Sequence, residues 1–143
     1  MSPYSPRETF DRHLHKLLEQ VLVFGNMVEQ AVTQAVAALQ QHDHLAARRI
    51  YENDQRINEK RFAIENECVV LIATQQPMAR DVRTLAAILE IITELERIGD
   101  YAKGIAKITL LLPVERIDPS ISGDLQQKQR DFCNALGIIA NPL

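Results

Sequence analysis

The chain has 143 residues, 46% of them hydrophobic, and this length fits one compact domain with a real core. Its formal net charge is −3 and its pI is near 5.8, so it lacks the excess of basic residues that binding to a nucleic-acid backbone requires. We therefore do not expect a nucleic-acid partner. Tryptophan is absent, aromatic residues make up 5%, and Gln, Ala, Leu and Glu are abundant, so we expect an all-α protein.

The first predicted element is one long amphipathic helix over Pro6–Gln41, where apolar residues recur every three or four positions. Ser5 and Glu8 have the spacing of a capping box, with proline at the first helical position. A short polar tract then breaks the pattern, and Asp43 is a suitable N-cap for a second helix from about His44 to Thr74. Because the turn is short, these two helices should be antiparallel neighbours.

A third helix is predicted from about Pro77, which cannot continue the second helix but can start a new one, to Leu112. Apolar residues recur every seven positions in the second helix, which favours left-handed, nearly parallel packing of helices. The expected fold is therefore an elongated antiparallel three-helix bundle, with helices about 45 to 54 Å long. Beside the regularly spaced aliphatic residues, its expected core includes Phe62, Ile72, Val82, Ile105 and Ile108.

We assign residues 1–112 to the bundle and residues 113–143 to a linker followed by a C-terminal tail or short helix. Two prolines and a glycine fall in the linker, and the apolar pattern beyond it is weak. No uninterrupted apolar run approaches the roughly 20 residues of a membrane span, and the N-terminus lacks the apolar stretch of a signal peptide. We therefore expect a cytoplasmic protein in which Cys68 and Cys133 are free thiols.

Two acidic motifs with a spacing of four residues are the candidate metal ligands. Glu96 and Asp100 share one face of the third helix, and Asp54 and Asn58 share one face of the second. Convergence of these four oxygen-bearing side chains would suit iron, manganese, magnesium or zinc. Such spacing is also common by chance, so solvated charges or ion pairs with Arg56, Arg97 and Lys103 are the alternative. Gly99, beside the second motif, removes side-chain bulk and lets a partner approach.

Catalytic machinery is not visible in the sequence. None of the four histidines follows a glutamate at the Glu-x-x-His spacing of di-iron bundle enzymes. A nucleophilic triad, a GxSxG elbow and a glycine-rich phosphate loop are all missing from the sequence. We therefore expect no catalytic residues and no enzyme activity.

The string QQPMARDVRTLAAILEIITELERIGDYAKGIAKI, residues 75–108, resembles the signature of the PhoU family of phosphate-uptake regulators. Phe10-Asp11, Asp54 and Ile57-Asn58 agree with it, so the resemblance covers about residues 7 to 112. It implies a three-helix bundle and a membrane-peripheral regulator that couples a phosphate ABC transporter ATPase to a sensor histidine kinase.

The resemblance also bears on metal. Some family members bind multinuclear iron or zinc clusters through an E/D-x-x-x-D motif on their helices. Glu96 and Asp100 match that motif in full, whereas Asn58 puts an amide in place of the second carboxylate of the Asp54 motif.

The chain departs from the family in length, because PhoU proteins resemble two tandem three-helix repeats and this chain has one repeat and a tail. A natural single-repeat protein that forms a homodimer and a prematurely terminated gene are both compatible with the sequence. A regulatory adaptor of phosphate homeostasis is the leading hypothesis. A structural oligomerisation module without metal or signalling function, and a carboxylate-bridged metalloenzyme, are the alternatives.

Overall fold

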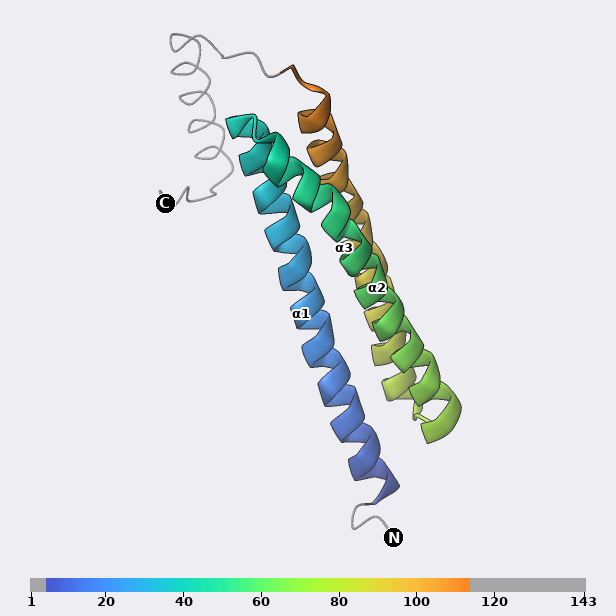
Figure 1. Ribbon diagram of the computed structural model, residues 1–143. Coiled ribbons are helices and arrows are strands. Elements are labelled where there is room, and N and C mark those ends of the chain that lie inside the picture. Colours follow the sequence, from blue (N-terminus) through green and yellow to red (C-terminus); the bar gives the residue numbers. More distant parts are fainter. Residues whose placement is uncertain (1–4, 114–143) are drawn as a thin grey trace, which may run out of the picture. The chain divides into compact units, whose positions relative to one another are not determined.

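Three helices make up the computed structural model, which describes residues 5–113. They are α1 (Pro6–Gln41), α2 (His44–Gln75) and α3 (Ala79–Leu111), and they pack against one another along their length (Figure 1). The predicted all-α three-helix bundle is confirmed. The predicted linker and tail after Pro113, and Cys133 within them, lie outside the described residues.

The first two helices begin at the predicted caps. Ser5 accepts a hydrogen bond from the Glu8 N–H at 3.3 Å, and the Glu8 carboxylate accepts one from the Ser5 N–H at 2.8 Å. Asp43 accepts a hydrogen bond from the Ala46 N–H at 2.9 Å, while His42, with φ of 52°, turns the chain through the left-handed region. This tight turn makes α1 and α2 antiparallel neighbours.

The third helix begins at Ala79, two residues later than predicted. Gln76 adopts a φ of 46° and ends α2, and Met78 is the N-cap residue of α3. The Met78 N–H donates to the Asp81 carboxylate at 3.0 Å, so Asp81 satisfies one of the free N–H groups at this helix start.

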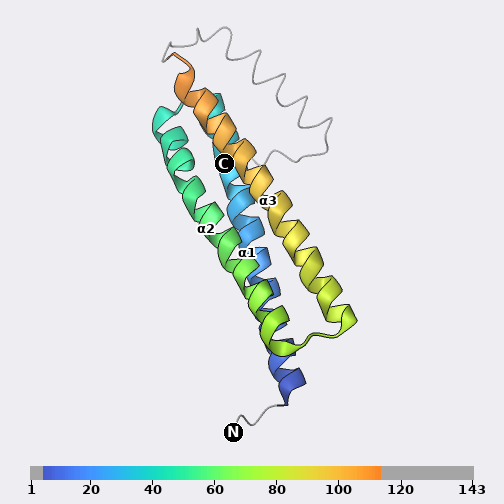
Figure 2. The ribbon, with the colours of Figure 1, turned by 90° about the vertical axis from the view of Figure 1, so that its right-hand side faces the viewer.

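Asp81 also joins the starts of α3 and α1. Arg7 donates two hydrogen bonds to it, at 2.5 and 3.2 Å, and pairs with Asp11 at 3.0 Å. The hydrogen bond from Arg7 holds the pKa of Asp81 below its ordinary value. Since the two helix starts lie together, α1 and α3 run in the same direction and α2 runs in the opposite one (Figure 2).

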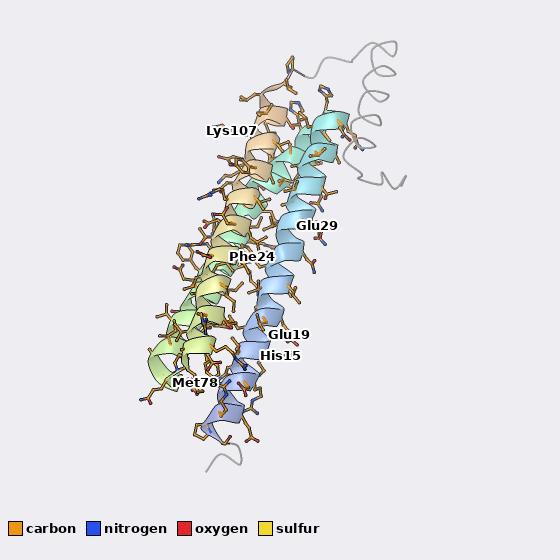
Figure 3. All side chains as sticks on the ribbon, turned by 180° about the vertical axis from the view of Figure 1, so that it is seen from behind. His15, Glu19, Phe24, Glu29, Met78 and Lys107 are labelled. Atoms are coloured by element: carbon orange, nitrogen blue, oxygen red, sulfur yellow. The ribbon has the colours of Figure 1, made fainter. Side chains whose placement is uncertain are left out.

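The core has two parts with different side-chain sizes. Large residues from all three helices fill the longer part, among them Phe24, Leu17 and Ile92. Figure 3 shows Phe24 within the bundle, whereas the exposed Glu29, five residues later, points outward. Nearer the α1–α2 turn, alanines dominate, which lets the helices approach closely. This second part contains Ala35, Ala38, Ala47, Ile50, Ala102 and Ala106.

Four of the residues expected in the core are exposed. Phe62 is 60% exposed and lies against the guanidinium of Arg61, 5.0 Å from its ring centroid. Ile72, Val82 and Ile108 are 41%, 41% and 54% exposed. The buried line of each helix is narrower than the apolar pattern suggests, so these side chains lie on its flanks. Ile105 is half-buried against the alanine-rich part, as expected.

Helix α1 is also long and apolar enough to cross a membrane by length and composition. An 18-residue window within it has a mean hydropathy of 1.2, and 22% of that window is buried in the bundle. The sequence prediction considered only uninterrupted apolar runs and did not find this window. A core helix of a soluble bundle meets the same criterion, so the finding alone does not indicate a membrane span.

Candidate functional site on the seam between α2 and α3

The four predicted metal ligands lie on the two helices that pack around Gly99. Asp54 and Asn58 are on α2, and Glu96 and Asp100 are on α3. A Cβ atom at Gly99 would lie 3.2 Å from Ile57 Cγ2, closer than ordinary van der Waals contact. The space that Gly99 leaves open is therefore filled by Ile57 of the same chain, and the approach of a partner at Gly99 stays a prediction.

Asp54 forms the first ion pair of this seam. Its side chain is only 4% exposed, and Oδ2 accepts a hydrogen bond from Lys103 Nζ at 2.8 Å and from Asn58 Nδ2 at 3.4 Å. The bond to Asp54 raises the pKa of Lys103 above its ordinary value. The Lys103 ammonium also lies 5.2 Å from the centroid of the Tyr51 ring. A buried carboxylate on α2 thus has its counter-charge on α3.

Glu96 forms the second ion pair, in which the acid is on α3 and the base is on α2. Its Oε2 lies 2.7 Å from Arg61 Nε, and Arg61 also pairs with Glu65 at 3.2 Å. Asp54 and Arg61 are seven residues apart on α2, as are Glu96 and Lys103 on α3. Because the helices are antiparallel, each helix contributes one acid and one base at matching heights. The charges of the two cross-helix pairs therefore balance.

The structure does not bring the four predicted ligands together as a metal site. Asp100 is exposed, and Glu96 and Asp54 are each engaged by a cation of the opposite helix. Within residues 5–113, no group of three or more His, Cys, Asp and Glu side chains is arranged to hold a metal ion. Two buried oxygens, Asp54 Oδ1 and Asn58 Oδ1, lack a hydrogen-bond partner. With Lys103 and Arg61 in place, these residues do not fit a metal ion, which requires more oxygen ligands than two.

Arg61 was missed by the sequence analysis, and Lys103 appeared there only as one possible ion-pair partner. The signal was available in the sequence, because acid and base alternate at seven-residue spacing on both helices. It becomes informative only once α2 and α3 are known to be antiparallel and in this register.

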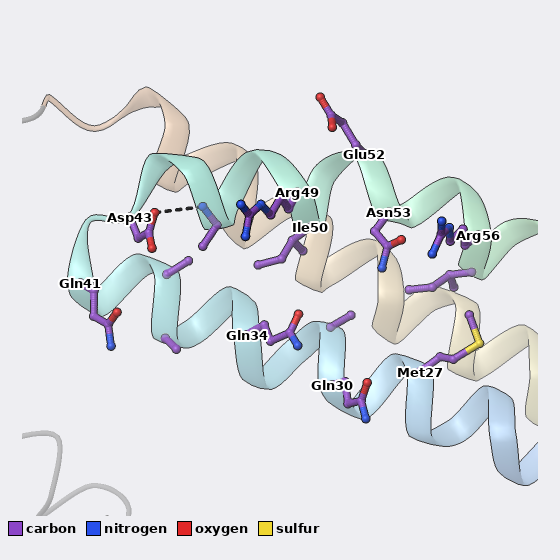
Figure 4. Close-up of a pocket in the computed structure, with 15 residues that line it drawn as sticks. Met27, Gln30, Gln34, Gln41, Asp43, Arg49, Ile50, Glu52, Asn53 and Arg56 are labelled. Atoms are coloured by element: carbon purple, nitrogen blue, oxygen red, sulfur yellow. Dashed lines mark hydrogen bonds between the residues drawn. The ribbon is translucent and has the colours of Figure 1, made fainter. Parts of the chain in front are cut away.

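A second candidate site is a groove of about 770 Å³ between α1 and α2 (Figure 4). Its charged lining residues are two acids and two bases, Asp43, Glu52, Arg49 and Arg56, and amides supply most of the other polar groups. Since the charges balance, the groove lacks the excess of positive charge expected of a site for phosphate or another anion.

These features define an all-α protein, a three-helix bundle with an ion-paired seam. The family described as PhoU domain matches residues 21–109, and the chain belongs to this PhoU family.

Relatives and a solved structure agree with this assignment. The chain is 42% identical over 120 residues to "Phosphate-specific transport system accessory protein PhoU homolog" of Burkholderia sp., covering 84% of this chain and 51% of that protein. It is 40% identical over 101 residues to "Phosphate-specific transport system accessory protein PhoU" of Escherichia coli (strain K12), covering 71% and 42%. The crystal structure of the phosphate transport system regulatory protein PhoU from Streptococcus pneumoniae superposes with a TM-score of 0.70 at 34% identity, covering 78% and 53%. The chain thus spans about half the length of the relatives it matches.

Proposed function

We propose that this chain is a regulatory adaptor of phosphate transport that acts by binding other proteins and not by catalysis. The observation that carries the proposal is the similarity over α1 to α3 to proteins described as accessory to the phosphate-specific transport system. The partners we propose are the ATPase of a phosphate transporter and a sensor histidine kinase. Nucleic acid is not among them, and a cytoplasmic adaptor of this kind reaches the membrane only through its partners.

The adaptor is proposed to work as a homodimer through an apolar face formed by α1 and α3. The exposed apolar residues that we assign to this face are Leu18, Leu22 and Val36 of α1 and Ile91, Ile98, Tyr101 and Ile108 of α3. Glu96 and Lys103, which contact α2, lie on the other flank of the α3 core line. The apolar residues of α3 therefore face away from α2, beside α1.

A second copy of the chain is the occupant that we propose for this face. Leu22 and Tyr101 are 71% and 65% exposed, and apolar residues repeated along two adjacent helices are typical of surfaces that bind another protein. The chain spans about half the length of the matched relatives, so a second copy would bring the pair to about their length. Paired apolar faces of this kind are typical of homodimers.

Light scattering tests the dimer separately from the regulatory role. We expect the double variant Leu22→Arg/Ile98→Arg to be a monomer, because dimerisation would bury unpaired charges in the apolar face. Leu45→Arg is the matched control, since Leu45 is also exposed, at 63%, but lies at the start of α2. A monomeric wild type, or a double variant that still dimerises, would contradict the proposed face.

The regulatory role is tested in a bacterial strain that lacks its own PhoU protein and carries a reporter of the phosphate-starvation response. We expect the wild-type chain to lower reporter output in high phosphate, and the monomeric variant to lose this effect. A wild type that folds and dimerises but leaves the reporter unchanged would favour a structural oligomerisation module, which the exposed apolar face alone would also support. A carboxylate-bridged metalloenzyme is not proposed, because cations occupy the positions that its metal ligands would need.

A further inference from the structure

We propose that the groove between α1 and α2 receives a helix of a partner protein, and that this helix carries two carboxylates seven residues apart. The inference rests on the adaptor role proposed above, for which it names the chemistry of the partner's contact surface. The groove is formed by α1 and α2, whereas the proposed dimer face is formed by α1 and α3. A dimer therefore leaves the groove open to a partner.

The shape of the groove suits a helix. On α1 its lining extends from Met27 to Gln41, which corresponds to about 21 Å along the helix axis. Its floor includes small side chains that are buried or half-buried, namely Ala31, Ala38 and Ala46. Small side chains allow the axis of another helix to come close. An elongated groove of about 770 Å³ between two helices is therefore a surface that an amphipathic helix can occupy.

The walls of the groove are polar and unpaired. Helix α1 contributes Gln30 and Gln34, and α2 contributes Arg49, Asn53 and Arg56, all of them exposed. Within residues 5–113, none of these five side chains forms a hydrogen bond or an ion pair with another residue. Amides donate and accept hydrogen bonds, and guanidinium groups donate them, so both walls offer free polar groups to an occupant.

Arg49 and Arg56 determine the charge that this occupant needs. They are seven residues apart on α2, about 10 Å along the axis, so they do not form one compact anion site. Carboxylates at positions i and i+7 of a helix lying along α2 repeat at the same distance and can pair with both bases. The two acids of the groove leave these bases free. Asp43 caps α2 through the Ala46 N–H, and Glu52 points away from α1 (Figure 4).

The first test measures the binding of synthetic helical peptides by fluorescence anisotropy. The probe is an alanine- and glutamine-rich peptide of about 20 residues with two glutamates seven residues apart. The control peptide has the same composition, but its glutamates are five residues apart and lie on different faces of the helix. We expect the wild type to bind the probe about fivefold to tenfold more tightly than the control peptide, because only the probe pairs with both Arg49 and Arg56. Added salt should weaken this preference.

Reversal of the two charges tests the pairing itself. Arg49→Glu/Arg56→Glu should lose the preference for the probe and should bind more tightly a peptide with lysines at the same two positions. Arg80→Glu/Arg83→Glu is the matched control, because Arg80 and Arg83 are also exposed but lie at the start of α3, and it should bind the peptides as the wild type does. Both variants replace exposed residues, so their melting temperatures should stay close to that of the wild type. Equal binding of the two acidic peptides by the wild type, or a preference that survives in Arg49→Glu/Arg56→Glu, would overturn the proposal.

Two further measurements separate this proposal from its alternatives. A changed oligomeric state of Arg49→Glu/Arg56→Glu by light scattering would assign the groove to a second copy of the chain and overturn the proposed partner helix. In the reporter strain this variant should dimerise but fail to lower reporter output, and full repression by the folded variant would overturn the groove as the partner's site. A wild type that prefers the probe but leaves the reporter unchanged would contradict the regulatory role while supporting the chemistry proposed for the groove.

Discussion

Gly99 offers the sharpest test of how α2 and α3 are held together, because two other glycines of the same chain serve as controls. In the middle of a helix, Gly→Ala is expected to stabilise the protein by roughly 0.5 to 1 kcal/mol through a smaller loss of backbone entropy. At Gly104 and Gly25 nothing lies within 4 Å of the added Cβ, so this gain should appear in full. At Gly99 the added atom would meet Ile57 Cγ2 at 3.2 Å and Cδ1 at 3.6 Å.

Ile57 is 4% exposed and cannot move away without disturbing the core. Overpacking of a well-packed site typically costs about 1 to 3 kcal/mol, which exceeds the gain from helix propensity. Gly99→Ala should therefore be net destabilising, whereas Gly104→Ala should be net stabilising. The two variants should differ in free energy of unfolding by about 1 to 3 kcal/mol.

Urea denaturation of the wild type and the two variants measures this difference, with an unchanged m-value showing that unfolding stays comparable. Ile57→Leu removes the Cγ2 branch and should reduce the cost of Gly99→Ala in the double variant. If Gly99→Ala were as stabilising as Gly104→Ala, the close approach of the two helices would be refuted, and with it the basis for the short ion pairs of the seam.

Three further predictions concern single groups. The lowered pKa of Asp81 means that its contact with Arg7 stabilises the fold above the unfolded pKa, about 3.9, and that this contribution disappears as the pH falls through the folded value. The difference in urea midpoint between the wild type and Asp81→Asn should accordingly be present at pH 7 and shrink below pH 4; a difference independent of pH would contradict the assignment. Burial raises the pKa of the Cys68 thiol to about 11, so a thiol reagent at pH 8 should label it only as fast as the bundle opens, and labelling in the burst phase would contradict its burial. Asp43→Ala should cost about 1 kcal/mol by urea denaturation through loss of the α2 cap, and an unchanged midpoint would show that the cap is dispensable.

The helices and their ends were predictable because their signals are local. A capping box, an aspartate cap and a proline are read within four residues of the helix end that they determine, and α1 was predicted to the residue. The start of α3 was wrong by two residues because the left-handed turn at Gln76 was not recognised.

Two features were harder to predict, namely which apolar residues of each helix are buried and which bases pair with the acidic motifs. Both were hard for the same reason. On α3, apolar residues occur on the buried line and on both of its flanks, so Val82 and Ile108 could not be separated from Leu85 and Ile92 by spacing alone. In the same way, Glu96 and Asp54 were correctly placed on helix faces, but the bases opposite them come from another helix. The groups that meet between two helices depend on the register of those helices, and the spacing of residues within each helix does not determine that register.

The three helices of residues 5–113 have a geometric consequence for any pair of these bundles. Because α1 and α3 point the same way, the start of α1 at Pro6 and the end of α3 at Leu111 lie at opposite ends of the bundle, separated by roughly 50 Å. The two ends of the bundle are therefore distinguishable, and we call the end at Pro6 the head and the end at Leu111 the tail. A single dye attached near Ser5 would lie close to its counterpart in a head-to-head pair and roughly 50 Å from it in a head-to-tail pair. One distance measurement on the dimer would thus reveal whether the two copies lie parallel or antiparallel.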